Sequence, residues 1–249
     1  MTPLSIVADP AEPVFVFDLD DTLYLERDFA RSGFAAVGGY VQDVLDIEGF
    51  AARCESLLSS GVRGRIFDRA LSELGCDGDS ALVERLVEIY RNHAPQIALA
   101  VDADACLARL RGRLALITDG PKVTQRAKIA ALGLEQRMEL IIATGAWPGD
   151  FGKPHPRAFT EVMAWSGQPA QAHVYVADNA AKDFITPRAL GWRTVQILRP
   201  GHVHHTVPAS PAHAADIMIE TLDDFPGCLK PASSGAGLAD RCAAFPQRP

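Results

Sequence analysis

The sequence lacks the long apolar runs that place a chain across a membrane. None of its 249 residues stands in an uninterrupted apolar stretch approaching about eighteen residues, the length that a spanning helix needs. Its first segment, MTPLSIVADPAEP, has neither a positively charged region nor an apolar run of signal-peptide length. We therefore expect no membrane partner and a cytoplasmic location.

Clustered positive charge and closely paired cysteines are also missing. The formal net charge is -7, and the densest basic cluster is the scattered set Arg109, Arg111 and Arg113, so we expect no nucleic-acid partner. The chain has five cysteines, which are widely separated and form no CxxC pair. This spacing argues against a zinc or redox site and predicts reduced, mostly structural thiols.

Apolar residues, in contrast, make up 48% of the chain, which is enough to bury a substantial core. Short apolar runs predict buried strands at 14–17, 114–117, 140–143, 174–177 and 194–197, with a further short strand at 217–219. Helical patterns separate the later runs, at 122–132, from 156 to about 165, and before Gly191. This alternation predicts an α/β fold with a doubly wound, Rossmann-like parallel sheet.

The stretch 25–101 has a different character. Its apolar residues recur at spacings of three and four, and the expected helices are 29–45, 50–58, 66–74 and 82–90. We interpret it as a small helical cap inserted after the first strand of a core domain formed by 1–24 and 102–225. The segment 226–249, rich in Pro, Gly, Ser and Ala, is expected to be a loosely ordered tail.

The first predicted strand ends in acidic residues. Asp18, Asp20 and Asp21 fall within four positions and are followed by Thr22. Carboxylates this close repel one another and favour a cation that neutralises them. Acidic residues of a solvated turn are the structural alternative.

The second strand end has the sequence Thr118-Asp119-Gly120 and directly precedes a predicted helix. The first amides of that helix could bind an anion, although a simple helix cap would use the same residue types. Lys153 stands between a glycine and a proline before the next predicted helix. A solvated lysine is the alternative interpretation there.

The fourth signal is Asp178, which follows the run 174–177, with Asp183 five positions later. The two acids can face one cation from a loop and the following helix start, or Asp178 can simply cap that helix. Successive strand ends thus carry an acid, a hydroxyl, a lysine and a second acid, in that order along the chain. Their joint occurrence favours a shared site over four separate structural roles.

This order of motifs resembles the haloacid dehalogenase superfamily. The segments 118–120 (TDG), 152–159 (GKPHPRAF) and 176–179 (VADN) look like those of its subfamily I phosphatases, and the helical insert looks like their C1-type cap. The resemblance covers roughly residues 14 to 200. Asp119 departs from the common asparagine, and Ala-Asp-Asn at 177–179 departs from the usual Gly-Asp-Ser.

The resemblance implies Mg²⁺ as the cofactor. It would be held by the carboxylate of Asp18, the backbone carbonyl of Asp20, and Asp178, with Asp183 supporting directly or through water. Asp18 would form a phosphoaspartate, while Asp20 would protonate the leaving oxygen and later activate water. The dehalogenases of this superfamily lack an acid at the position of Asp20, so phosphoryl transfer is preferred to carbon–halogen cleavage.

Other residues are expected to bind the substrate. By resemblance, Thr118 and Lys153 would bind the transferring phosphoryl group, and Thr22, Asp119 and Gly120 would surround it. Arg63 and Arg65, in the glycine-flanked loop 61–65, could place a guanidinium over the leaving group, although the sequence favours the alternative of a solvated surface loop. The loop 201–205, with His202, His204 and His205, is expected to be polar rather than metal-binding.

We expect the partner to be a small phosphorylated metabolite, and the chain to be a monomer or a homodimer. Sugar phosphates come first by analogy, then nucleotide or flavin-precursor monophosphates. A phosphomutase that uses the same phosphoaspartate remains open. A receiver-like or non-catalytic phospho-ligand-binding protein is disfavoured, because receivers carry the phosphoacceptor on their third strand and have no long insert after the first.

Overall fold

The computed structural model describes residues 12–76, 78–203 and 207–225. Its centre is one six-stranded sheet in which every pairing is parallel, in the order β3-β2-β1-β4-β5-β6. The strands are β1 (Val14–Phe17), β2 (Arg113–Pro121), β3 (Leu140–Gly145), β4 (His173–Ala177), β5 (Arg193–Ile197) and β6 (Ile217–Ile219). This sheet confirms the α/β fold predicted from the sequence.

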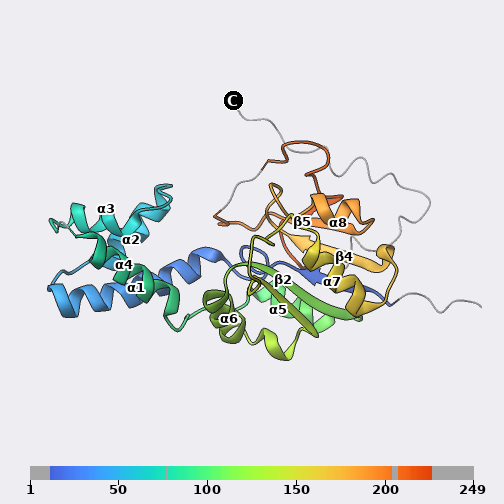
Figure 1. Ribbon diagram of the computed structural model, residues 1–249, viewed down its shortest axis with the longest axis horizontal. Helices are drawn as coiled ribbons and strands as arrows, with labels where there is room; N and C mark the ends of the chain where they lie inside the picture. The colour runs from blue at the N-terminus through green and yellow to red at the C-terminus, as the bar shows by residue number, and fades with distance from the viewer. Residues whose placement is uncertain (1–11, 77, 204–206, 226–249) are drawn as a thin grey trace, which may run out of the picture.

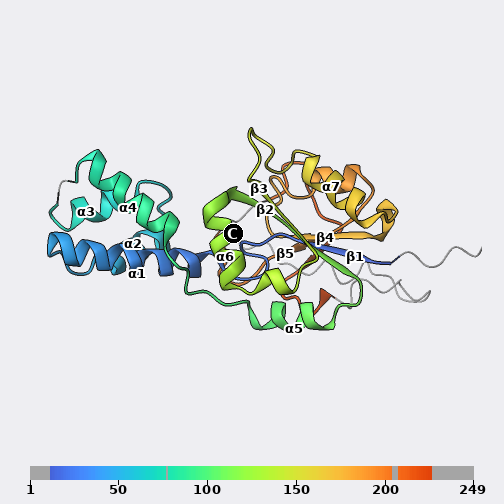
Figure 2. The same ribbon diagram turned by 60° about the horizontal axis from the view of Figure 1, so that its bottom comes forward.

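Helices cover both faces of the sheet (Figures 1 and 2). Because side chains alternate along a strand, Phe15 and Phe17 of β1 pack with α5 (Val101–Arg109) and α6 (Lys122–Ala131). Val14 and Val16 pack on the other face, in the cluster that includes α7 (Arg157–Ser166). Helix α8 (Ile185–Ala189) lies between β4 and β5 in the chain. Both faces of β1 are therefore buried, as its uninterrupted apolar sequence predicts.

Four helices between β1 and α5 form a separate bundle beside the sheet (Figure 1). They are α1 (Glu26–Leu45), α2 (Phe50–Ser59), α3 (Ile66–Glu73) and α4 (Ser80–Asn92). Phe34, Val37, Phe50 and Leu86 are among the buried residues of a hydrophobic cluster that this bundle forms by itself. Each expected helix of this stretch is present, with bounds that differ by a few residues.

Helix α5 was not anticipated. Its sequence is short and rich in alanine and aspartate, so its apolar pattern is weak. Ala103, Cys106 and Leu107 nevertheless bury one side of it against the sheet. Packing therefore stabilises a helix whose periodicity alone does not reveal it.

The contacts between the bundle and the core include two hydrogen bonds. The Thr124 hydroxyl of α6 donates to the Arg91 carbonyl oxygen at 3.2 Å, and Arg63 Nη2 donates to the Val203 carbonyl oxygen at 3.5 Å. Among the described residues, no helix is both long and apolar enough to cross a membrane. The expected loose tail, 226–249, lies outside the described residues, as do His204 and His205.

Candidate active site

The carboxyl ends of three neighbouring strands bring the predicted motif residues together. Asp18 follows β1, and its backbone N–H donates to the Val176 carbonyl oxygen of β4 at 2.9 Å. Thr118 lies in β2 on the other side of β1, and Asp178 follows β4. Since β1 stands between β2 and β4, all three side chains reach one edge of the sheet.

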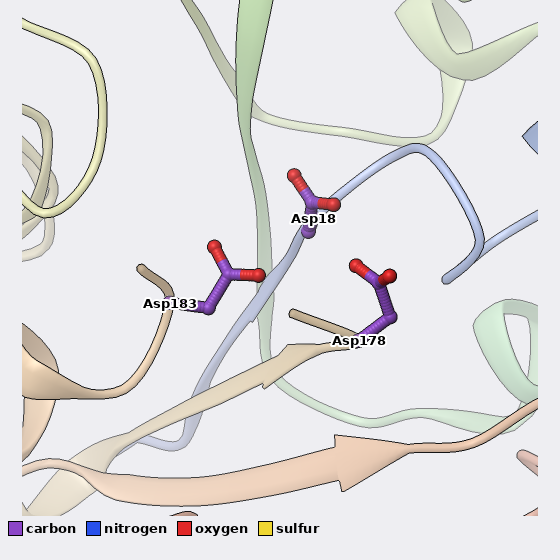
Figure 3. A group of neighbouring side chains, drawn as sticks. All are labelled: Asp18, Asp178 and Asp183. Carbon is purple, nitrogen blue, oxygen red and sulfur yellow. The ribbon is translucent and has the colours of Figure 1, made fainter. Parts of the chain in front are cut away.

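Three of the carboxylates converge. Asp18, Asp178 and Asp183 are buried, and each offers an oxygen within 4.8 Å of the others. Figure 3 shows the three side chains pointing toward a common space from the ends of two strands and from the loop after β4. Buried carboxylate oxygens at this separation are the donor set that Mg²⁺ prefers, so these residues fit the expected ion.

Lys153 balances part of this negative charge. Its ammonium lies 2.5 Å from Asp18 Oδ1 and 2.8 Å from Asp183 Oδ1, and it donates to the Tyr175 hydroxyl at 3.0 Å. Burial alone would lower the pKa of Lys153, but the charges of Asp18 and Asp183 raise it well above its usual value. Lys153 is therefore a fixed cation beside the first carboxylate.

One buried lysine cannot neutralise three buried carboxylates. Burial, opposed by Lys153 and assisted by Asp183, raises the pKa of Asp18 to about 6. Burial and the charges of Asp18 and Asp183 raise the pKa of Asp178 to about 9. The mutual repulsion of these carboxyl groups would be relieved by a divalent cation, which favours the expected Mg²⁺ site.

Asp20 lies outside the converging group and has partners of its own. Lys128 Nζ contacts Asp20 Oδ1 at 2.7 Å, Gln125 Nε2 donates to Oδ2 at 3.1 Å, and the Tyr24 hydroxyl also donates to Oδ1. Burial raises the pKa of Asp20, but the Lys128 charge and these hydrogen bonds lower it below its usual value. In this arrangement Asp20 is a carboxylate.

Asp119 and Lys182 form an ion pair at the mouth of the site. Lys182 Nζ lies 2.8 Å from Asp119 Oδ2, while Asp119 Oδ1 accepts from the Thr144 hydroxyl at 2.8 Å and from the Lys153 backbone N–H at 3.2 Å. Lys182 lines the same pocket as Asp18 and Asp178. The acidic residue that departs from the family pattern thus holds a second lysine beside the acid cluster.

The other residues expected to contact substrate, Thr118, Thr22 and Gly120, have different surroundings. Thr118 is fully buried, and its hydroxyl accepts a hydrogen bond from Gln125. Thr22 is also fully buried, and it does not line the pocket that contains Asp18 and Asp178, which we call the acid pocket. Gly120 has φ of +125°, a conformation that a side chain would strain.

The two arginines of the loop after α2 differ in their partners. Arg65 pairs with Asp68 at 2.9 Å, and its side chain is 84% exposed. Arg63 donates to the carbonyl oxygens of Leu58 and Val62 at 2.9 and 3.0 Å, and it forms no ion pair with a carboxylate of the described residues. The sequence does not reveal this difference between the two arginines.

Gln125, Lys128 and Lys182 are among the residues of the site that were not singled out from the sequence. Gln125 and Lys128 are three positions apart at the start of the helix that follows the Thr118 motif, so they share one helix face. Lys182 directly precedes Asp183. Proximity to the motifs was the available signal, but a lysine or glutamine on a helix is too common to be selected by it.

Comparisons with known proteins agree with this geometry. The family model described as a haloacid dehalogenase-like hydrolase matches residues 13–191. A phosphoserine phosphatase of Thermus thermophilus is 33% identical over 144 residues, which are 55% of this chain and 56% of that protein. The chain thus matches only about half of the length of this relative.

Two further comparisons cover more of the chain. A glyceraldehyde 3-phosphate phosphatase of Methanocaldococcus jannaschii is 27% identical over 197 residues, 74% of this chain and 84% of that protein. The crystal structure of the hydrolase YfnB from Bacillus subtilis, which is bound to magnesium, has a TM-score of 0.62 at 18% identity. The match covers 88% of this chain and 99% of the YfnB chain, and it shows a similarity of fold.

Proposed function

The chain belongs to the haloacid dehalogenase-like hydrolase family, and from this premise we propose that it is a magnesium-dependent phosphatase acting on a small phosphorylated metabolite. One observation carries the proposal: a buried carboxylate, Asp18, stands 2.5 Å from a buried lysine within a group of three acids, with a second carboxyl, Asp20, two residues further on. Both named curated relatives are phosphatases, which supports the same class of reaction.

In the first step, an oxygen of Asp18 bonds to phosphorus while the bond from phosphorus to the leaving oxygen breaks. Lys153 and the Thr118 hydroxyl bind phosphoryl oxygens and offset their charge. Asp18, Asp178 and Asp183, with the Asp20 backbone carbonyl, would hold Mg²⁺, which supplies positive charge that lets an anionic nucleophile approach an anionic ester.

Asp20 acts on the proton in both steps. It gives a proton to the leaving oxygen, and then removes one from the water that attacks the phosphoaspartate, which releases inorganic phosphate and restores Asp18. The Lys128 contact at 2.7 Å favours the carboxylate form, which the second step needs. The first step needs the protonated form, so the Asp20 carboxyl must part from Lys128 before the leaving group departs.

The remaining residues have supporting roles in the proposal. Residues 25–101 act as a cap over the carboxyl ends of the strands, while Asp119 and Gly120 shape the phosphate site. Thr22, whose side chain is fully buried like that of Thr118, stays a predicted substrate contact at the end of the loop that carries Asp18 and Asp20.

The test is the substitution Asp18→Asn, assayed by inorganic phosphate release from a panel of phosphate monoesters. The amide keeps the shape of the side chain but cannot form the phosphoenzyme, so we expect turnover to vanish while the folded state persists in circular dichroism. Chelation should silence the unmodified enzyme and Mg²⁺ should restore it. Activity of the variant within tenfold of the wild type would remove Asp18 as the nucleophile.

A further inference from the structure

A cavity of about 520 Å³ lies in the helical bundle formed by α1–α4, beside the acid pocket. Apart from Val203, all of its lining residues come from the bundle between Glu26 and Arg91. We call it the cap cavity. Because the bundle supplies nearly all of its wall, a rigid movement of the bundle relative to the sheet would carry the cavity along intact (Figure 1).

The cap cavity adjoins the pocket of the catalytic centre. Glu26 lines both this cavity and the pocket that contains Asp18 and Asp178. Val203, the contribution of the core, donates its backbone N–H to Asp21 Oδ2 at 2.7 Å, and Asp21 also lines the acid pocket. A molecule with its phosphate at Asp18 can therefore extend past Glu26 into the bundle.

Aromatic rings form a large part of the cavity wall. Phe34, Phe67 and Tyr90 all line it, and their ring centroids lie 5.7 to 6.2 Å from one another. Val83 and Val87 add aliphatic surface from α4. Aromatic and branched apolar walls favour a flat or apolar ligand over a fully hydroxylated one.

The size of the cavity decides between ligand classes. A volume near 520 Å³ lies within the range of about 300 to 1,000 Å³ that is typical of sites for drug-sized ligands. A three-carbon leaving group would fill only a small part of this volume. The leaving group that fits is larger and carries a ring.

Arg63 supplies a polar contact at the edge of the cavity. Its guanidinium donates to the carbonyl oxygens of Leu58 and Val62, and within the described ranges it pairs with no carboxylate. It can therefore donate to an acceptor oxygen or nitrogen of a ligand without first breaking an ion pair. Arg65 lines the cavity too, but its charge is already paired with Asp68.

We propose that the cap cavity binds the leaving alcohol of the substrate, and that this alcohol carries a planar heterocycle, so that the substrate is a phosphate monoester of the size and shape of a nucleoside monophosphate. This inference rests on the proposed phosphatase function. It differs from the triose and amino-acid esters in the names of the two curated relatives, and it reverses the order of substrate classes expected from the sequence.

The experiment compares substrates that differ only in the ring. Ribose 5-phosphate and the purine and pyrimidine nucleoside 5′-monophosphates share a primary leaving oxygen, so their intrinsic reactivity is similar. We expect kcat/KM for at least one nucleotide to exceed that for ribose 5-phosphate by tenfold or more. Equal values, or a preference for ribose 5-phosphate or glyceraldehyde 3-phosphate, would overturn the proposal.

Matched variants test where the preference arises. Val87→Phe fills the cap cavity, and we expect the ratio of kcat/KM for nucleotide to that for ribose 5-phosphate to fall at least tenfold. Val44→Phe makes the same change on α1 at a residue that is 57% exposed, and both values should stay unchanged. A ratio that survives Val87→Phe would show that the ring binds elsewhere, against the proposal.

Arg63→Ala should lower the same ratio about tenfold. Its control is Arg111→Ala, because Arg111 likewise donates to two backbone carbonyls but lies just before β2, at the opposite edge of the sheet from the site. Acetyl phosphate, which has no ring, tests the phosphatase activity separately from the role of the cap cavity. If neither acetyl phosphate nor any phosphate monoester is hydrolysed, the proposed phosphatase function fails. If acetyl phosphate is hydrolysed and the nucleotides are not preferred over ribose 5-phosphate, only the present proposal fails.

Discussion

Asp18 combines two opposed electrostatic effects. Burial raises its pKa to about 6, while the Lys153 ammonium at 2.5 Å opposes that shift. A carboxyl with this pKa is mostly ionised at neutral pH, as a nucleophile must be. The same burial lowers the local dielectric response, so that each fixed charge acts more strongly on a bound phosphoryl group.

The proposed acid and base role of Asp20 can be tested by substitution. Asp20→Asn should slow turnover of alkyl phosphate monoesters by roughly 10² or more, the range of lost general acid and base catalysis. The loss should be smaller for p-nitrophenyl phosphate, because its leaving oxygen needs little protonation. Steady-state kinetics with both kinds of ester provides the measurement, and an equal loss for the two would argue for a structural role of Asp20.

Lys182 gives the second prediction. If it adds a cation beside the phosphate site, Lys182→Ala should weaken inhibition by inorganic phosphate by about 1 to 3 kcal/mol, the range of a charge-assisted hydrogen bond. Asp119→Asn should weaken it less, because the amide can still accept from Lys182. Lys122→Ala, at an exposed lysine that begins α6, is the matched control. Unchanged inhibition in Lys182→Ala would limit the ion pair to a structural role.

At the scale of elements, a buried ion pair joins three segments that are distant in sequence. Arg199, two residues after β5, contacts both carboxylate oxygens of Asp102 in α5 at 2.7 and 2.8 Å, and donates to the Thr22 carbonyl oxygen at 2.8 Å. Asp102 also accepts from the Leu222 backbone N–H at 2.7 Å. The pair thereby connects the loop after β1, helix α5 and the segment that follows β6.

Removing one partner of this pair should be costly, because the other charge stays buried and loses its counterion. We expect Arg199→Met to lower the free energy of unfolding by about 3 to 5 kcal/mol in urea titrations. Arg137 offers the control, since it pairs with Asp104 of the same helix α5 at 2.6 Å but at the surface. Arg137→Ala should cost about 1 kcal/mol or less. Similar losses in both variants would contradict the importance of burial.

Folding of the whole molecule brings the carboxylates of Asp18, Asp178 and Asp183 close together, whereas they are far apart in the unfolded chain. Asp178 has a pKa of about 9 in the folded state without metal, whereas an aspartate in an unfolded chain titrates near 3.9. As pH rises between these values, the unfolded chain gives up this proton while the folded chain retains it. This group therefore makes the metal-free protein less stable toward alkaline pH.

Mg²⁺ should reverse that loss, because it binds the carboxylate form and binds the folded state alone. We expect the rise in Tm on adding saturating Mg²⁺ to be larger at pH 8 than at pH 6, as measured by differential scanning calorimetry. Asp178→Asn should remove most of the difference between the two pH values. An equal rise at both values in the wild type would show that metal binding does not compete with the Asp178 proton.

Local patterns in the sequence predicted the strands and most helices, and they placed acidic, hydroxyl and lysine side chains at the strand ends. Continuous apolar runs predicted each of the six strands, because a strand buried on both faces needs apolar side chains at every position. The order of Asp18, Thr118, Lys153 and Asp178 identified the edge where they meet, since parallel strands present their carboxyl ends together. These inferences use local patterns, which a single sequence contains.

Only the tertiary structure decided which side chains meet across long separations. Asp20 and Lys128 are 108 positions apart, and Asp102 and Arg199 are 97 apart; neither pair has a periodicity that a sequence pattern can reveal. Other features also depend on how packed helices and loops are oriented. They are the contacts of Arg63, the pairing of Asp119 with Lys182 and the aromatic cavity of the bundle. Packing of whole elements sets those contacts, whereas spacing along the chain sets only the elements themselves.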